Sequence, residues 1–130
     1  MKGSKEDYLK YRISKSHEIY EDAVLLIKNG RWNSAVNRLY YSSYYLASAL
    51  LYKHKIKVET HNGIKTQLFL HFVKTGKLSK ELGKLYSHLF DWRQETDYAD
   101  FIEFDEATVS PLLSEVEELN KILEGLIENA

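Results

Sequence analysis

This sequence predicts an all-α fold, an up-and-down helical bundle of about five helices, on three observations. Apolar side chains recur at three- to four-residue intervals along most of the chain, which is the helical period. No segment alternates polar and apolar residues as a strand does, and no segment is repeated. The connections between the periodic segments are short, which favours antiparallel neighbours. The length of 130 residues fits a single domain spanning residues 1–130.

We expect the bundle to form around the segment Arg31–Tyr52. It combines five tyrosines with many small residues and contains no Gly or Pro, so nothing in it opposes a helix. Apolar or aromatic side chains cover nearly every direction around its axis, which is typical of a buried helix. Its charges are confined to Arg31 and Arg38. A guanidinium such as that of Arg38 needs an acidic partner, an interface or a ligand in such a helix.

Two other helices are predicted in the first half of the chain. One covers residues 4–29, which begin with a capping serine and end with an Asn-Gly stop. It should pair with the tyrosine-rich segment as an antiparallel hairpin. After a polar, basic loop, the other runs from His61 to about Lys74 behind the capping Thr60, and a glycine stops it.

Two more helices complete the expected bundle. Ser79 caps the first of them, which should fray near Thr96–Asp100. The acidic stretch 100–106 is expected to form a turn. The last helix begins between Asp105 and Pro111 and continues almost to the end of the chain, because proline is tolerated in a first helical turn.

Composition excludes several classes of function. The chain has no cysteine, so thiol chemistry and disulfides are absent. Its charged start does not resemble a signal peptide, and no run of eighteen apolar residues exists, so we expect a cytoplasmic protein with no membrane contact. The net charge is −1, but the first 65 residues are basic and the last 65 acidic. This polarity suits pairing between helices and, in one interpretation, between subunits.

No metal or cofactor is expected. His17 and Glu21 share a helix face, as do His88 and Asp91, but the Glu-x-x-His pairs of di-metal bundles do not occur. Two such ligands on one face are common by chance, so surface or structural roles are the simpler interpretation. Gly-rich phosphate loops and nucleophile elbows are also missing.

The stretch from Asp91 to Tyr98 is the most informative for function. Arg93 and Asp97 stand four residues apart, and an ion pair along a helix is the simplest interpretation. The stretch also lies where a helix should end, where side chains and backbone groups face ligands. On a straight helix Arg93 and Tyr98 would be about 140° apart. They converge only if the helix breaks near Thr96.

A series of short motifs in a fixed order extends over roughly residues 15–127. In order they are Asn29-Gly30, Arg31-Trp32, Ala35-Val36-Asn37-Arg38, Tyr40-Tyr41, Tyr44, Ala49-Leu50-Leu51, His61-Asn62-Gly63, Phe69, Phe72-Val73-Lys74-Thr75-Gly76, and Arg93 with Asp97-Tyr98. Together they resemble the HEPN domain family, in particular its small stand-alone prokaryotic members. The resemblance implies a helical bundle, often dimeric, that brings two arginine-centred motifs together. Many members are metal-independent ribonucleases, often toxins neutralised by a nucleotidyltransferase antitoxin.

The sequence departs from the catalytic motif of those ribonucleases, which is Arg, four to six residues, then His. After Arg93 the position with a gap of four is Tyr98, and no histidine lies within the spacing. Histidine transfers protons near neutral pH, whereas tyrosine, with a pKa of about 10, is a poor base there. Arg93 still suits bidentate phosphate binding. In space, His61 or His88 could replace the missing histidine.

Three functions therefore remain open. The first is a HEPN module that binds RNA or a nucleotide without efficient cleavage; the second is an active ribonuclease toxin with an unusual base. The third is a structural partner of a nucleotidyltransferase, and a homodimer is expected in each case. The candidate residues for phosphate, RNA or nucleotide binding are Arg93, Asp97, Tyr98, Arg38, Tyr41 and His61.

Overall fold

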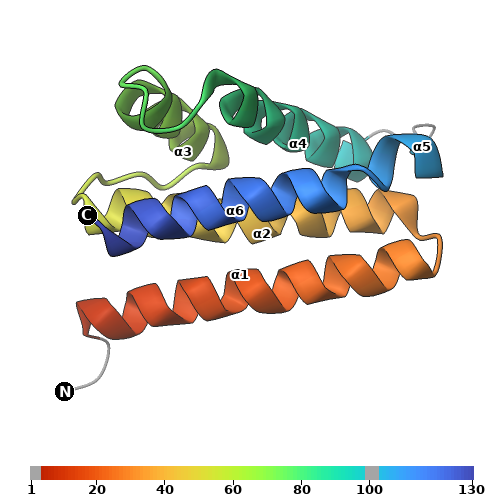
Figure 1. The fold of residues 1–130 in the computed structure, drawn as a ribbon, viewed down its shortest axis with the longest axis horizontal. Helices are drawn as coiled ribbons and strands as arrows, with labels where there is room; N and C mark the ends of the chain where they lie inside the picture. The colour runs from red at the N-terminus through yellow and green to blue at the C-terminus, as the bar shows by residue number, and fades with distance from the viewer. Residues whose placement is uncertain (1–3, 99–102) are drawn as a thin grey trace.

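The structure, a computed structural model, describes residues 4–98 and 103–130, and α-helices make up most of this part of the chain (Figure 1). The elements are α1 (Lys5–Lys28), α2 (Trp32–Lys53), α3 (His61–Leu68), the π-helical turn η1 (Phe69–Val73), α4 (Lys80–Tyr98), α5 (Glu106–Val109) and α6 (Leu112–Glu128). No β-strand occurs within these described residues. The predicted all-α class is therefore confirmed.

The four long helices run alternately up and down. Figure 1 shows α1 and α2 as an antiparallel hairpin, with α4 running back and α6 returning beside α2. Helix α2 contacts α1, α3, α4, α5 and α6, so it is the shared centre of the bundle. Helices α3 and α4 lie on one side of α2, away from α1. None of the helices described is long and apolar enough to cross a lipid bilayer.

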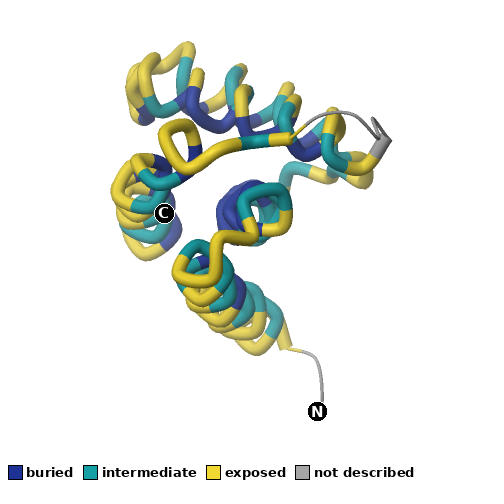
Figure 2. The backbone as a smooth tube through the Cα atoms, turned by 90° about the vertical axis from the view of Figure 1, so that its right-hand side faces the viewer, coloured by how far each residue is buried: buried dark blue, intermediate teal, exposed yellow. Residues whose placement is uncertain are grey.

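Helix α2 supplies the centre of the core, as the tyrosine-rich segment predicts. Half of its 22 residues are buried, and in Figure 2 it lies in the middle of the molecule and is largely dark blue. Leu39, Tyr40, Leu46 and Leu50 have no exposed surface. Burying a large apolar side chain contributes roughly 1.5–3 kcal/mol, so this helix holds much of the stability of the fold.

A polar seam also joins α2 to its neighbours. The hydroxyls of Ser16 and Ser42 each donate to the backbone carbonyl of the other residue, at 2.7 and 2.9 Å. Ser43 donates to Asn120 Oδ1 at 2.8 Å, and the Asn120 amide donates to Ser42 Oγ at 2.9 Å. Small side chains let α1 and α6 approach α2 closely, and the bonds satisfy hydroxyls that burial would otherwise leave unpaired.

The predicted helix starts are confirmed at three positions. The side chains of Ser4, Thr60 and Ser79 accept hydrogen bonds from backbone N–H groups three residues later. Gly30 ends α1 with φ of 69°, the left-handed conformation that a glycine adopts without steric cost.

Two predicted helices differ in detail. The third changes from α to π geometry at Phe69, so five residues of it belong to η1. The last divides into α5 and α6 around Ser110 and Pro111. Proline has no N–H group and its ring crowds the preceding turn, so the two segments do not merge into one helix.

The fraying expected near Thr96–Asp100 is not seen at Thr96–Tyr98, and α4 has no break at Thr96. Helix α4 continues through Thr96 to Tyr98, and the Thr96 hydroxyl donates to the Arg93 carbonyl at 2.8 Å. The Tyr98 side chain and residues 99–102 lie outside the described part of the chain, so the first three residues of the acidic stretch 100–106, which was expected to form a turn, lie outside it as well. The helix break that would bring Tyr98 toward Arg93 is therefore absent.

Candidate phosphate-binding cluster

Three tyrosines of α2 turn toward α3 and α4. Tyr40, Tyr41 and Tyr44 are spaced so that they share one side of the helix, since residues one and four apart lie within about 100° of each other. Tyr40 is fully buried, whereas Tyr41 and Tyr44 are half-buried. His61, the first residue of α3, stacks on Tyr44 with ring centroids 4.3 Å apart and planes at 9°. Its ring also lies 5.7 Å from that of Tyr41.

Arg93 enters this group from α4. Its guanidinium carbon lies 5.1 Å from the centre of the Tyr40 ring and 5.9 Å from that of Tyr41. Aromatic faces attract a cation at such distances. We call Arg93, Tyr40, Tyr41, Tyr44 and His61 the arginine–tyrosine cluster.

The charge of Arg93 is incompletely satisfied by the protein. The residue is only 8% exposed, yet its hydrogen bond to a carboxylate, from Nη1 to Asp97 Oδ2, is long at 3.3 Å. Nε is buried without a hydrogen-bond partner among the residues described. Because a buried charge is costly unless it is paired and hydrogen-bonded, Arg93 retains capacity to bind an anion. The predicted ion pair with Asp97 is confirmed.

A second guanidinium lies at the edge of the cluster. Arg38 donates from Nε and Nη2 to Asn37 Oδ1, at 3.1 and 2.8 Å, and its guanidinium carbon lies 5.2 Å from the Tyr41 ring. Among the described residues no carboxylate forms an ion pair with it. The Asn37 amide and the Tyr41 ring thus contact Arg38 in place of an acidic side chain, which was one of the partners expected for it. Tyr41 lies between two arginines.

Burial and the nearby cation set the protonation of the cluster. Burial raises the pKa of Tyr40 far above its usual value, so this hydroxyl keeps its proton. Burial, and secondly the charge of Arg93, lower the pKa of His61, so its imidazole is neutral at neutral pH. Tyr40 and His61 share a hydrogen bond of 2.8 Å at Nδ1. In one tautomer the hydroxyl donates to Nδ1; in the other it accepts, and Nε2 then carries the free lone pair.

The structure brings together most of the residues proposed from sequence. Arg93, Tyr41 and His61 belong to the cluster, and Arg38 and Asp97 contact it directly. The Tyr98 side chain lies outside the described residues. Sequence reasoning assigned no binding role to Tyr40 and Tyr44, although their spacing of four on one helix face was a signal. His88 is exposed and lies against Trp92, with ring centroids 5.4 Å apart.

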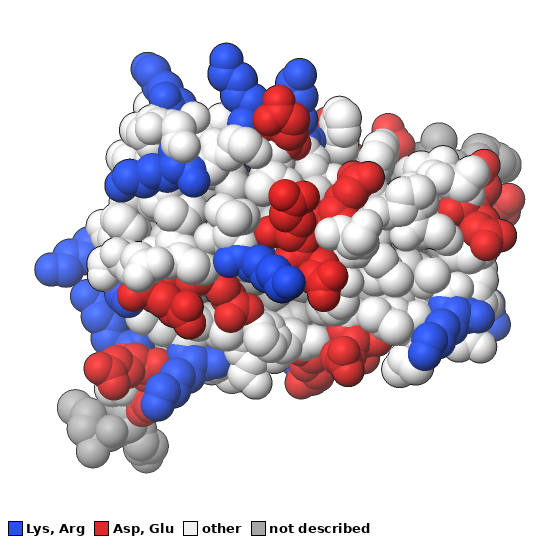
Figure 3. Space-filling model, in the orientation of Figure 1, with Lys and Arg blue, Asp and Glu red and all other residues white. Residues whose placement is uncertain are grey.

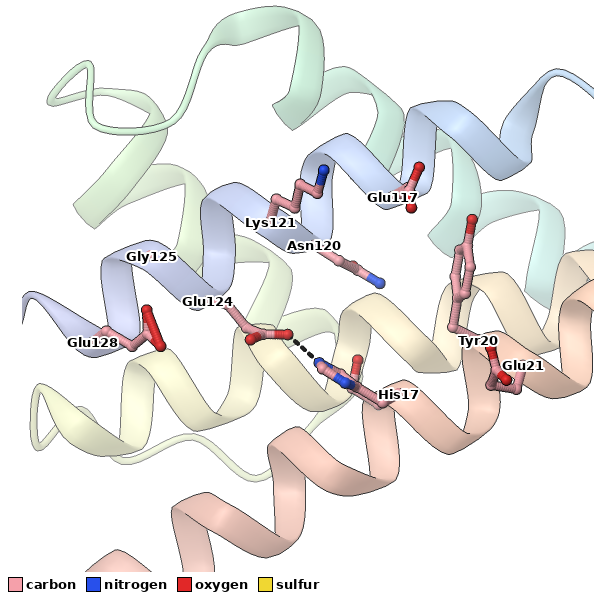
Figure 4. A pocket seen from close by; sticks show the side chains of 10 residues that line it. His17, Tyr20, Glu21, Glu117, Asn120, Lys121, Glu124, Gly125 and Glu128 are labelled. Atoms are coloured by element: carbon pink, nitrogen blue, oxygen red, sulfur yellow. Dashed lines mark hydrogen bonds and ion pairs between the residues drawn. The ribbon is translucent and has the colours of Figure 1, made fainter.

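A groove of about 540 Å³ lies between α1 and α6, and Arg93 is not among its lining residues (Figure 4). We call it the acidic groove, after Glu21, Glu117, Glu124 and Glu128 in its walls. His17 extends from α1 to form an ion pair with Glu124 of α6. Acidic side chains extend across the middle of the face in Figure 3. No group of three or more His, Asp or Glu residues in the described parts of the chain is placed to hold a metal.

A helical bundle whose central tyrosine-rich helix packs against a buried arginine of a later helix defines the class of protein. The family model of the HEPN domain matches residues 9–126, and the chain belongs to that family. The resemblance drawn from the sequence motifs is thereby confirmed.

Several relatives agree with this assignment. A UPF0332 protein of Thermotoga maritima is 40% identical over 96% of this chain and 95% of its own. A protein of Methanocaldococcus jannaschii that is named as a candidate toxin, MJ0142, is 31% identical over 78% of this chain and 69% of its own. A second candidate toxin of that organism, MJ0605, is 29% identical over 58% and 57% of the two chains.

Proposed function

We propose that this protein binds RNA or a nucleotide through the arginine–tyrosine cluster, without efficient cleavage, as part of a toxin–antitoxin-like system. The observation that carries the proposal is Arg93, a buried cation whose donors the protein satisfies only in part. Membership of the HEPN family and the toxin names of two relatives support the setting.

The chemistry of the cluster suits a phosphate group next to a base. The guanidinium of Arg93 presents forked donors that match two phosphate oxygens. Arg38 supplies a second positive charge on the other side of Tyr41. The half-buried ring of Tyr41 offers a face for base stacking, which contributes about 1–3 kcal/mol per base in single-strand binding. Asp97 holds Nη1 of Arg93 until an anion competes for it.

Efficient cleavage requires more than phosphate binding. One group must take the proton of the attacking 2′-hydroxyl and another must protonate the leaving 5′-oxygen. Each such group contributes about 10²–10⁴-fold. At the position where the family's ribonucleases carry histidine, this chain carries Tyr98.

A metal-independent ribonuclease is the second candidate function, because His61 lies in the cluster. Because the pKa of His61 is lowered, its imidazole is neutral at neutral pH, as a general base must be. In the tautomer that donates from Nδ1 to Tyr40, Nε2 could accept the 2′-hydroxyl proton. Arg93, the cation of the cluster, would stabilise the negative charge that develops on the phosphorus oxygens.

Partner proteins belong to the same proposal. We expect a homodimer with the Arg93 regions near the two-fold axis, since the basic and acidic halves of the chain could then meet reciprocally. Light scattering that found only a 15.2 kDa species at high concentration would contradict it. A nucleotidyltransferase is the expected heterologous partner. If the protein were chiefly its structural partner, the pair would co-purify while RNA binding stayed absent.

The test of the binding function is fluorescence anisotropy with a labelled single-stranded RNA and with Arg93→Met. Methionine keeps much of the side-chain volume but removes the charge. We expect binding to weaken roughly 10–100-fold, for the loss of a charge-assisted contact of about 1.5–3 kcal/mol. The control is Lys84→Met on the exposed face of the same helix, which removes an equal charge. Equal affinities of the two variants would show that Arg93 is structural.

Cleavage is measured on the same RNA in the presence of a chelator. Slow or absent cleavage by the unaltered protein is the expected result. Robust cleavage that both Arg93→Met and His61→Phe abolish would promote the second candidate function to first place.

A further inference from the structure

A second groove, of about 640 Å³, opens beside the arginine–tyrosine cluster. The start of α1, the end of α2 and the segment that precedes α3 form its walls. We call it the basic groove and define it by Lys5, Arg12, Lys55, Lys57, Tyr8 and Tyr52. Tyr44 also lines it, and the same tyrosine stacks on His61 of the cluster. The two sites are therefore contiguous through a single ring.

Positive charge in the basic groove is poorly compensated. Glu59 is the single acidic residue among its lining residues, against four cations. Within the described part of the chain, none of the four forms an ion pair with a carboxylate. Like charges gathered in a concave site raise the local potential and attract anions. Two tyrosine rings, Tyr8 and Tyr52, meet beside them with centroids 4.4 Å apart.

Arg12 is held in a fixed position within this groove. Its Nε donates to the Tyr8 hydroxyl at 2.8 Å and its Nη1 to Ser48 Oγ at 3.0 Å. The guanidinium also lies 4.9 Å from the centre of the Tyr45 ring. Nη2 has no hydrogen-bond partner among the described residues, so a rigid donor remains for a ligand. Pre-ordering of this kind lowers the entropic cost of binding.

The backbone at Lys55 supports a role for its side chain. After α2 ends, Ile56 N–H donates to the Leu51 carbonyl at 2.9 Å and Lys55 N–H to the Tyr52 carbonyl at 3.0 Å. Lys55 itself has φ of 62°. The same arrangement ends α1, where the left-handed position is occupied by Gly30.

The ends of α1 and α2 can be compared directly, because the hydrogen bonds that close each of them join backbone groups only. A glycine would satisfy them at Lys55 with less strain, since the left-handed conformation is unfavourable for residues with a Cβ atom. Strain of this kind is concentrated at functional sites. The Lys55 side chain lines the basic groove, so a ligand contact made by this side chain would explain why a lysine occupies the strained position.

We propose that the basic groove binds the neighbouring nucleotide of a single-stranded RNA whose phosphate lies at Arg93, with Tyr44 between the two positions. The inference rests on the proposed function and adds a second binding position to it. Cations for phosphates interleaved with aromatic rings for bases are what single-stranded nucleic acid requires. An acidic peptide would use the charges but leave the Tyr8–Tyr52 pair without a planar partner.

The experiment compares a labelled oligouridylate with uridine monophosphate, using Lys55→Gly, Lys57→Gln and the control Lys28→Gln. Lys28 is exposed in the last turn of α1, at the opposite end of that helix from Lys5. We expect Lys55→Gly to raise the melting temperature by a few degrees yet bind the oligonucleotide about tenfold more weakly. Lys57→Gln should weaken it as well. The plot of log Kobs against log salt has a negative slope, and each lost phosphate contact should make that slope less steep by about 0.7.

Mononucleotide binding separates the two sites. It should stay unchanged in all three lysine variants and fall in Arg93→Met. The inference is overturned if Lys55→Gly and Lys57→Gln bind the oligonucleotide as Lys28→Gln does; if Arg93→Met still weakens binding in that case, the proposed function stands alone. If the lysine variants weaken binding but Arg93→Met does not, the Arg93 proposal and the contiguous path both fall. If the unaltered protein does not bind RNA, both the proposed function and this inference are overturned.

Discussion

The arginine–tyrosine cluster and the acidic groove lie on two sides of α2. The cluster contains a buried cation, whereas the groove contains solvent-exposed carboxylates. In the cluster, a buried guanidinium packs against aromatic rings with one long bond to a carboxylate. In the groove, carboxylates from two helices face water, and one of them pairs with His17. Exposed pairs contribute about 0–1 kcal/mol, whereas an under-satisfied buried charge costs several. This cost is the reason that we propose a ligand for the cluster and none for the acidic groove.

The pKa values of one tyrosine in each region show the same difference in nearby charge. Burial raises the pKa of Tyr20, in the groove, and the nearby carboxylates of Glu117 and Glu21 raise it further. Burial also raises the pKa of Tyr40, but there the charge of Arg93 acts in the opposite direction. The nearby charges are thus carboxylates at Tyr20 and a cation at Tyr40. Negative charge is therefore disfavoured beside Tyr20 and favoured beside Tyr40 by the charges nearest to each ring.

The largest expected effect is the loss of stability in Tyr40→Ala. Removing a fully buried ring that packs on Tyr41, Tyr86 and Phe90 should cost about 3–5 kcal/mol, because the cavity cannot collapse completely. Urea unfolding measures it. Tyr20→Ala is the comparison in the groove, where the ring is half-buried and its hydroxyl donates to the Leu113 carbonyl. A cost in Tyr20→Ala as large as that in Tyr40→Ala would remove the energetic distinction between the two regions.

Next in size is a gain of cleavage in Tyr98→His. This change restores the family's spacing after Arg93 and adds a group that transfers protons near neutral pH, so cleavage of single-stranded RNA should rise about 10²–10⁴-fold. A gel assay with a chelator present detects it. Arg93→Met in the same background should abolish the gain. An unchanged rate would mean that the cluster lacks more than the histidine.

The pH dependence of stability gives a smaller effect. The folded-state pKa of His61 lies below the ordinary value of 6.5, so below that pH the unfolded chain binds a proton that the folded chain does not. Stability contributed by neutral His61 is therefore complete above pH 6.5 and is lost as the pH falls toward the folded-state pKa. Unfolding free energies across this range should fall less steeply in His61→Phe. A profile with the same slope in both proteins would contradict the assignment.

The smallest effect is expected for His17→Ala in the acidic groove. Its ion pair with Glu124 is largely exposed on the histidine side, so its loss should cost no more than about 1 kcal/mol. RNA binding should not change, since the residue lies away from both proposed nucleotide positions. Thermal unfolding and anisotropy together check this. A loss of RNA affinity would show that the groove takes part in binding.

Local sequence patterns were sufficient for most of the fold. The capping side chains of Ser4, Thr60 and Ser79 act within three residues of themselves, and the left-handed stop at Gly30 is equally local. The fraying expected near Thr96–Asp100 is not seen as far as Tyr98, the last described residue of α4. A threonine hydroxyl can bond back to the helix and leave it continuous, as the Thr96 hydroxyl does with the Arg93 carbonyl.

The sequence by itself determined the all-α class, the central position of α2 and the HEPN family, because these depend on periodicity, composition and motif order. Only the tertiary structure decided that His61 stacks on Tyr44 and that Arg93 packs on Tyr40, since these contacts join residues far apart in the chain. The strain at Lys55 also required coordinates, because nothing in the letters around it distinguishes a left-handed lysine from an ordinary one. Helical periods report which face of a helix is buried; which faces then meet depends on packing among all the helices.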